Sequence, residues 1–336
     1  MLNLKSLFHS LMPARRPAVP QSRRARPRLE VLEDRNAPAM LTWAGAAGGL
    51  WSVGGNWTGG TGVAPANNDT LLLAKNTSSQ DDIANLSLFK LDIQNTYKST
   101  LTLAQDLTVT GTVNMAGAGK IDGVAKTLTL PNGSSVLNWS SGEIASKVVL
   151  GKNGTNPTVN ITGAVTLSST SFDSFATTIW TGGDSTMGNG SKFTNEASAT
   201  FDARSDQKIL VPVGTAGFSN AGGTFKKSLG AGTTEIRSSF TTTGPLIAGS
   251  GNIYFSGAAL FTQNAGGVIT LNGGSLQTLV ASTSQEANWR EPERSRAGSP
   301  PALAGCPERS ISWAVTTPRQ GSANWSSTWL PGVSDF

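Results

Sequence analysis

The chain has 336 residues, with a single cysteine (Cys306) and a single histidine (His9). These counts exclude a disulfide framework and a cysteine-based zinc site, and any Ser–His or Cys–His catalytic pair would have to use His9. Charged residues are only 14% of the chain. The net charge of +5 comes entirely from residues 1–40, because the remaining residues carry equal numbers of basic and acidic side chains. The neutrality of residues 41–336, which we call the body, argues against a nucleic-acid-binding surface on them.

Residues 1–40 are rich in Arg and Pro and are predicted to be a disordered leader or targeting segment outside the fold. Residues 28–38 read RLEVLEDRNAP. This stretch resembles the R-L-E-x-L-E-x-R-x-x-P leader motif of large secreted proteins from one group of environmental bacteria, and the resemblance implies export. The competing interpretation is a basic tail on a cytosolic protein. No run of 18 or more apolar residues follows, so we expect no transmembrane segment.

Residues 41–285 consist of short segments in which apolar residues alternate with Thr, Ser or Asn, as in residues 100–104, 107–113 and 158–161. Such alternation is typical of half-buried strands. The segments are separated by Gly, Asn and Asp, for example at residues 131–133 and 272–274, which are typical of turns. The sequence therefore predicts an all-β domain over residues 41–285.

Phenylalanine recurs at the spacing of one turn of a parallel β-helix. Phe193, Phe218, Phe240 and Phe261 follow one another at intervals of 21 to 25 residues. A single turn of this length buries too little apolar surface to offset its ordering entropy, so turns have to stack. We therefore predict a right-handed parallel β-helix, or solenoid, of about eleven turns, taking roughly 22 residues per turn.

Stacking also predicts ladders of identical side chains. Asn195 and Asn220 follow equivalent Phe residues by two positions, and they are expected to hydrogen-bond to each other along the column.

A tryptophan signature opens the body: Trp43, Trp51-Ser52, Asn56-Trp57, Pro65 and Asp69. The signature resembles the start of autotransporter-type and related secreted β-helix proteins. Four further segments resemble the repeats of large bacterial adhesin-like β-helix proteins: residues 134–144, 193–195, 218–228 and 232–236. The resemblance implies a parallel β-helix, an extracellular or cell-surface setting and an adhesive role. It brings no catalytic residue with it.

The C-terminal part departs from this pattern. Residues 286–310 are rich in Arg, Glu and Pro, and we interpret them either as a disordered linker or as the trace of a reading-frame error. Residues 311–336 repeat the start of the signature at Trp313, Asn324-Trp325, Pro331 and Asp335. They are predicted to be the truncated start of a second unit, so the chain is expected to be a fragment of a larger surface protein, and a nonfunctional fragment stays a third possibility.

Asp202, Arg204, Asp206 and Lys208 form the densest group of charges in the body. On one strand they would share a face, and two acids alternating with two bases would neutralise one another in solvent. The alternative is a sugar-binding or catalytic patch, because glycoside hydrolysis uses two facing carboxylates and β-helix lyases use acids around Ca²⁺.

Three further groups are predicted to be structural. Asp81 and Asp82 are expected in a solvent-facing loop, Lys226 and Lys227 as an outward pair, and Asn67-Asn68-Asp69 in a turn. The three tryptophans of residues 43–57 are expected to cap the open end of the core, with sugar stacking as the alternative.

The sequence as a whole favours a non-enzymatic secreted or cell-surface protein that serves adhesion or structural display. We predict no catalytic residue, no cofactor and no metal, and the expected partners are extracellular glycans or other cell-surface components, not nucleic acid. The alternative is a polysaccharide-active enzyme or carbohydrate-binding module on the same scaffold, using Asp202 and Asp206 or the tryptophans. The oligomeric state is not predicted.

Overall fold

The computed structural model describes residues 38–60, 62–152, 154–256, 261–279, 283–284 and 288–289. The predictions made for the leader up to residue 37, for nearly all of the 286–310 segment and for the 311–336 unit lie outside the described residues. His9 and Cys306 also lie outside them.

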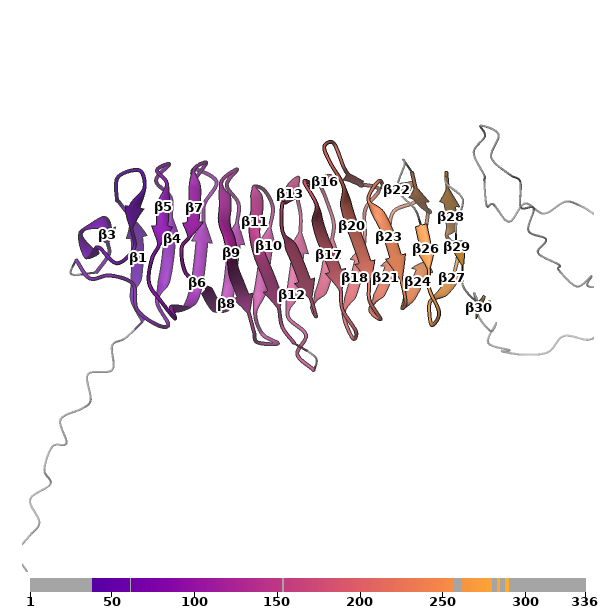
Figure 1. Cartoon of the computed structure of the whole chain (residues 1–336), viewed down its shortest axis with the longest axis horizontal. Helices are drawn as coiled ribbons and strands as arrows, with labels where there is room; N and C mark the ends of the chain where they lie inside the picture. The colour runs from indigo at the N-terminus through magenta and orange to yellow at the C-terminus, as the bar shows by residue number, and fades with distance from the viewer. Residues whose placement is uncertain are drawn as a thin grey trace, which may run out of the picture. The chain divides into compact units, whose positions relative to one another are not determined.

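Apart from one short 3-10 helix, the regular secondary structure of the described residues consists of strands (Figure 1). The first part contains β1 (Met40–Trp43), β2 (Gly49–Leu50), the 3-10 helix η1 (Gly54–Asn56), β3 (Trp57–Thr58), β4 (Thr70–Leu73), β5 (Ser79–Asp81), β6 (Ser87–Ile93), β7 (Thr100–Leu103), β8 (Leu107–Met115), β9 (Lys120–Leu130), β10 (Val136–Trp139), β11 (Glu143–Leu150), β12 (Thr158–Ile161), β13 (Val165–Ser168), β14 (Ser171–Ser174) and β15 (Thr177–Trp180). The second part contains β16 (Ser185–Gly188), β17 (Ser191–Asn195), β18 (Thr200–Ala203), β19 (Lys208–Leu210), β20 (Ala216–Asn220), β21 (Thr224–Lys227), β22 (Thr233–Ile236), β23 (Ser239–Thr242), β24 (Pro245–Ala248), β25 (Asn252–Phe255), β26 (Phe261–Gln263), β27 (Val268–Leu271), β28 (Ser275–Thr278), β29 (Thr283–Ser284) and β30 (Asn288–Trp289).

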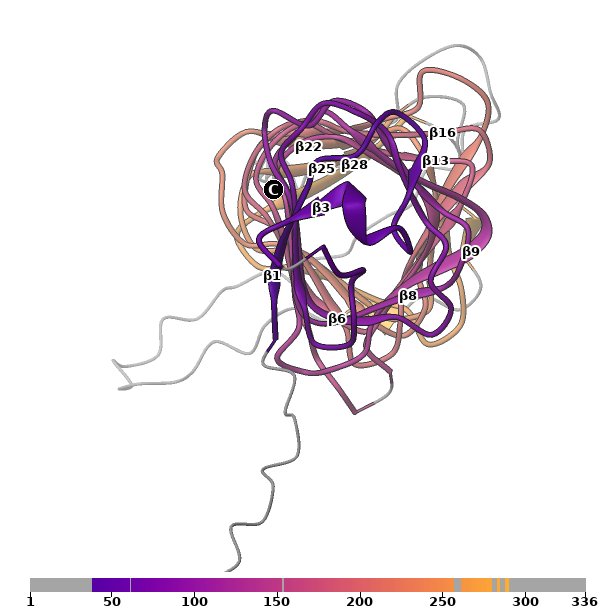
Figure 2. The ribbon, with the colours of Figure 1, turned by 90° about the vertical axis from the view of Figure 1, so that its left-hand side faces the viewer.

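These strands wind into a parallel β-solenoid with three sides (Figure 2). The Phe side contains β14, β17, β20, β23 and β26, and each of these strands pairs in parallel with the next. The Thr side contains β8, β10, β12, β15, β18, β21 and β24 in the same way. The third side contains β13, β16, β19, β22 and β25. The all-β class and the parallel solenoid predicted from the sequence are confirmed.

The solenoid has fewer complete turns than the sequence predicted. About nine turns contribute a strand to all three sides, from the turn of β6 and β7 to the turn of β26, β27 and β28. The expectation of eleven turns assumes that all of residues 41–285 form complete turns of roughly 22 residues each. This number is wrong because β1, β2, β4 and β5 build only the Thr side and the third side, and the residues between β2 and β4 form a closing structure at the N-terminal end.

The recurrent phenylalanines form a ladder inside the column, as predicted. Phe172, Phe193, Phe218, Phe240 and Phe261 are all buried and lie in register on the Phe side. Their successive ring centroids are 4.9, 4.9, 5.1 and 6.0 Å apart, and the rings are stacked. Offset-stacked rings add about 0.5–1.5 kcal/mol per pair to the burial of their area. The phenylalanine repeat therefore reports the spacing of the turns directly.

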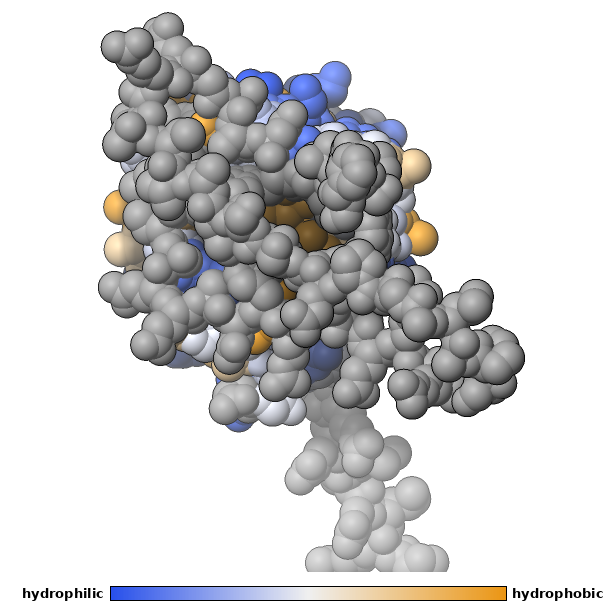
Figure 3. Space-filling model, turned by 90° about the vertical axis from the view of Figure 1, so that its right-hand side faces the viewer, coloured by the Kyte–Doolittle hydropathy of each residue, from blue (hydrophilic) through white to orange (hydrophobic). Residues whose placement is uncertain are grey.

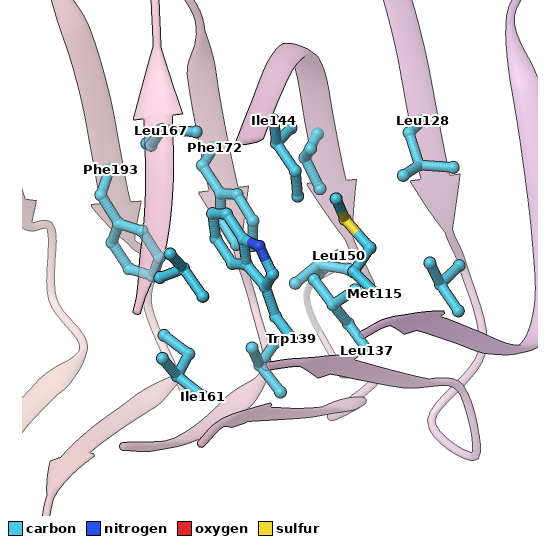
Figure 4. Packing of buried hydrophobic residues seen from close by; sticks show 14 of the residues in the cluster. Met115, Leu128, Leu137, Trp139, Ile144, Leu150, Ile161, Leu167, Phe172 and Phe193 are labelled. Carbon is cyan, nitrogen blue, oxygen red and sulfur yellow. The ribbon is translucent and has the colours of Figure 1, made fainter. Parts of the chain in front are cut away.

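Aliphatic side chains continue the core toward the N-terminal end. Figure 4 shows Trp139 beside Phe172, with ring centroids 6.1 Å apart and parallel planes, and Leu137 and Leu150 close by. The same in-register stacking holds for smaller residues, because every second residue of each strand points inward. Figure 3 faces the C-terminal end of the solenoid, where apolar residues are visible near the centre and the rim carries both hydrophilic and apolar residues.

The predicted asparagine ladder is confirmed at the corner that follows the Phe side. The Nδ2 atom of Asn195 donates to Oδ1 of Asn220 at 2.7 Å, and the Nδ2 atom of Asn220 donates to Oγ1 of Thr242 at 2.9 Å. The same two amides also donate to the backbone carbonyls of Thr224 and Pro245. Buried polar groups are costly unless they are hydrogen-bonded, so this corner holds successive turns in one register.

Replacing a ladder phenylalanine is expected to be severely destabilising. Phe218→Ala leaves a cavity between two stacked rings, and we expect the free energy of unfolding to fall by about 3–5 kcal/mol in urea denaturation. Val124→Ala is the control, because Val124 is 91% exposed and should change stability by less than about 0.5 kcal/mol. Equal effects of the two substitutions would contradict the ladder as the core of the fold.

Candidate functional site

The three tryptophans of the opening signature close the N-terminal end of the core. Trp43, Trp51 and Trp57 are at most 3% exposed, and Trp57 packs edge-to-face against both others at 5.2 and 5.6 Å. The indole Nε1 of Trp57 donates to the backbone carbonyl of Trp51 at 2.9 Å. Strand β3 runs antiparallel to β1, and η1 and β3 lie across the end of the column in Figure 2. The capping prediction is confirmed, and sugar stacking on these rings is wrong because their faces are covered.

Asp69 completes this cap. Its Oδ1 accepts from the backbone N–H of Ala39 at 2.7 Å, and its Oδ2 accepts from the N–H of Ala66 at 2.8 Å. The residue precedes β4, and the predicted turn is confirmed at residues 67–68. The predicted Asx pattern, in which the side chain binds the N–H two residues later, is not formed, because Asp69 binds N–H groups that precede it. This carboxylate is therefore occupied by the backbone and holds the entry of the chain into the column.

The four charges of residues 202–208 do not share one strand face, so that prediction is wrong. Strand β18 ends at residue 203 and β19 begins at residue 208, with bends between them. Asp202 is only 1% exposed, because Arg204 and Lys226 cover it, with N–O distances of 2.8 and 3.4 Å to its Oδ2. Lys208 instead pairs with Glu235 of the next turn at 3.3 Å. The mutual neutralisation is real, but only the Asp202–Arg204 pair lies within this segment, and Lys208, Lys226 and Lys227 make their pairs between neighbouring turns.

Lys227 is buried, so the prediction of an outward Lys226–Lys227 pair is wrong for the second lysine. Its Nζ donates to Oδ1 of Asp206 at 2.6 Å and to Oγ1 of Thr234 at 3.1 Å. It also donates to the backbone carbonyls of Ser205 and Leu229 at 3.1 and 3.0 Å. The hydrogen bond from Lys227 lowers the pKa of Asp206. Asp202 and Asp206 are bound to different cations, Arg204 and Lys226 for Asp202 and Lys227 for Asp206.

Removing the carboxylate partner of Lys227 is expected to destabilise the column. In Asp206→Ala the buried ammonium keeps only neutral acceptors, and we expect the free energy of unfolding to fall by about 1.5–3 kcal/mol. The double variant Lys227→Met/Asp206→Ala should recover most of this loss, because no buried charge is then left uncompensated.

The control is Asp122→Ala. Asp122 pairs with Lys120 at 3.2 Å on the surface, and such pairs contribute at most about 1 kcal/mol. A double variant that is less stable than Asp206→Ala would show that the cost does not come from the unpaired ammonium.

Asp81 and Asp82 differ in environment, and the prediction that both face solvent is wrong for Asp81. Asp81 is fully buried, and its Oδ1 accepts from the backbone N–H of Ile83 at 3.2 Å. Its Oδ2 makes no hydrogen bond to any residue that the structure describes. Burial raises the pKa of Asp81 to about 7, against the lowering effect of the Ile83 N–H and with a further rise from the charge of Asp82. Asp82 accepts from the N–H and hydroxyl of Ser52 at 2.9 and 2.5 Å, which ties the cap to β5.

The raised pKa predicts that the protein becomes less stable as pH rises from about 4 to about 7. In this window the unfolded chain has lost the Asp81 proton at its ordinary pKa of 3.8, while the folded protein still holds it. Because the unfolded state binds fewer protons, stability falls by up to about 1.4 kcal/mol per pH unit and then levels off. Asp81→Asn should remove this slope and be more stable than the wild type at pH 8. Urea denaturation at pH 4.5, 5.5, 6.5 and 8 measures the free energy of unfolding of both proteins. The same pH dependence in wild type and Asp81→Asn would refute Asp81 as its cause.

The outer surface of the Thr side carries an uncharged array. Its members are the outward residues of β8, β10, β12 and β15, which are Thr112, Asn114, Val136, Asn138, Thr158, Asn160, Thr177 and Ile179. All eight are half-buried by their neighbours in the array. Asn160 donates to Asn138 at 2.8 Å, and Asn138 donates to Asn114 at 2.9 Å. Sequence reasoning missed this array because only the pairing register brings its members into two rows.

Charges on the rest of the outer surface are largely paired. On the third side, Glu235 binds Arg237 at 2.8 Å and Lys208 at 3.3 Å. The hydrogen bond from Arg237 lowers the pKa of Glu235 to about 2, with help from Ser256 and Lys208 and against the effect of burial. Within the described residues no group of three or more His, Cys, Asp or Glu side chains has the arrangement of a metal site.

Comparisons with family models, with curated proteins and with solved structures give no match for this chain. The fold and the local geometry therefore carry the functional argument. In the described part of the chain, no helix combines the length and the apolar character needed to cross a membrane.

Proposed function

We propose that the protein is a non-enzymatic, secreted or cell-surface column that serves adhesion or structural display. The observation that carries this proposal is the uncharged array on the Thr side, in which threonine and asparagine side chains repeat once per turn. A repeated, rigid set of hydrogen-bonding groups suits many weak contacts with an extended surface, which together give strong attachment. The leader motif and the adhesin-like repeats seen in the sequence support the extracellular setting.

The contacts of the acidic residues also support a non-enzymatic role. A glycosidase needs one carboxyl that donates a proton and a second that acts as nucleophile or base. Asp202 is covered by Arg204 and Lys226, and Asp206 is bound to the buried Lys227. Both carboxylates therefore neutralise neighbouring cations, and the tryptophans suggested for sugar binding lie inside the cap.

Two measurements test the proposal. The full-length chain with an epitope tag, produced in its native host, is expected on the outside of intact cells, where added protease degrades it. Beads coated with the purified chain are expected to attach to extracellular polysaccharide films more strongly than beads coated with albumin. An intracellular, protease-protected chain, or coated beads that do not attach, would overturn it.

The enzymatic alternative is tested separately. We expect no new reducing ends and no unsaturated products when the purified chain is incubated with acidic and neutral polysaccharides, with and without Ca²⁺. Turnover that disappears in Asp202→Ala but persists in Asp122→Ala would replace the proposed role with a catalytic one.

A further inference from the structure

We propose that the amide–hydroxyl array of β8, β10, β12 and β15 binds a neutral, extended polysaccharide that lies along the column. This inference rests on the proposed adhesive function and names the ligand class and the surface that binds it. It follows from the composition of the array, the pairing of the charges at its two ends and the hydrogen-bonding groups that its side chains leave open.

The charges at both ends of the array are neutralised. Toward the N-terminus, the next positions of the two rows are Lys90 and Asp92, which pair with each other at 2.8 Å. Toward the C-terminus, the second row continues with Asp202, which is paired with Arg204 at 2.8 Å. A phosphate, sulfate or carboxylate ligand needs uncompensated positive charge, which these pairs do not supply. The array therefore suits an uncharged ligand.

The asparagine ladder orders its amides and leaves hydrogen-bonding capacity toward solvent. An asparagine amide has two N–H donors, and Asn138 and Asn160 each use one of them on the preceding asparagine. Among the described residues, no partner accepts the second N–H of either amide, and the hydroxyls of Thr112 and Thr158 make no hydrogen bond. The open groups are donors and donor–acceptor hydroxyls, which match the hydroxyls of a saccharide.

The array is also rigid before any ligand binds. Threonine, valine and isoleucine are restricted at χ1 by their branched Cβ atoms, and the asparagines are held by the ladder. Binding therefore loses little side-chain entropy. The groups repeat every ~4.8 Å along the column, which is the distance between neighbouring strands. An extended β-linked glycan advances by a similar step per sugar, so one chain can contact successive turns.

The test uses the full-length protein and three variants whose substitutions keep side-chain volume. Thr158→Val/Asn160→Leu removes the open groups at the centre of the array while keeping side-chain volume. The matched control is Thr241→Val, which removes an outward hydroxyl from β23 on the Phe side. Unchanged far-ultraviolet circular dichroism and melting temperatures confirm that each variant folds. Asn138→Asp is a second array variant, because it places an unpaired carboxylate in the ladder without changing its shape.

Binding is measured by co-sedimentation with microcrystalline cellulose and by affinity electrophoresis in soluble xylan and in polygalacturonate. We expect the wild type and Thr241→Val to bind cellulose or xylan equally, and both array variants to bind at least tenfold more weakly. Binding should change little between low and high salt, since no charge is involved. The inference is overturned if no neutral glycan binds, if polygalacturonate binds best in low salt, or if the array variants bind like the wild type.

These outcomes are separate from those that test the proposed function. If coated beads still attach to polysaccharide films when the array variants are used, the adhesive role stands and the array is not its binding surface. If the chain is intracellular, or shows turnover that depends on Asp202, the proposed function itself fails.

Discussion

Parallel, in-register stacking of turns is the constraint on which the whole structure depends. One turn of about twenty residues buries too few side chains to fold alone, so each turn needs a neighbour to cover its core and to pair its backbone. Once register is set, every inward position becomes a continuous row, as in the stack from Phe172 to Phe261. The same condition explains the tryptophan cap, because the first turn has no earlier neighbour and Trp43, Trp51 and Trp57 cover the end of the rows.

Buried polar groups give the column a specific register where apolar rows alone do not. If the stack were misaligned by one turn, phenylalanine would again lie on phenylalanine. The misalignment would, however, separate Asn195 from Asn220 and Lys227 from Asp206. Such shifts leave a buried amide or ammonium without its partners, which is far more costly than a change of apolar contacts. Asp81 is the opposite case, since one of its oxygens has no partner among the described residues and its burial couples stability to pH.

Side chains on the outer surface repeat once per turn as the core side chains do, but most of them are polar or charged. Outward residues also form rows, so one threonine or asparagine per turn becomes a regular array, and one acid per turn becomes a ladder of ion pairs with the next turn. Many of the charges of the described residues are paired within the column, and in the array of β8, β10, β12 and β15 the groups left open are uncharged donors and hydroxyls. These open neutral groups are the observation that supports the proposed adhesive or display role.

The sequence by itself determined the fold class, the phenylalanine ladder, the Asn195–Asn220 bond and the capping tryptophans, because each depends on a period that is visible along one chain. The tertiary structure alone decided which charges are buried and what they contact. Asp81 and Lys227 look like surface residues in the sequence, and Asp202 to Lys208 look like one strand face. Lys227 contacts Asp206, 21 residues earlier, and Lys208 and Lys226 pair with acids of neighbouring turns. Only the pairing register between turns brings these groups together. The uncharged array has the same origin, since no local pattern shows which outward residues of four separate strands become neighbours.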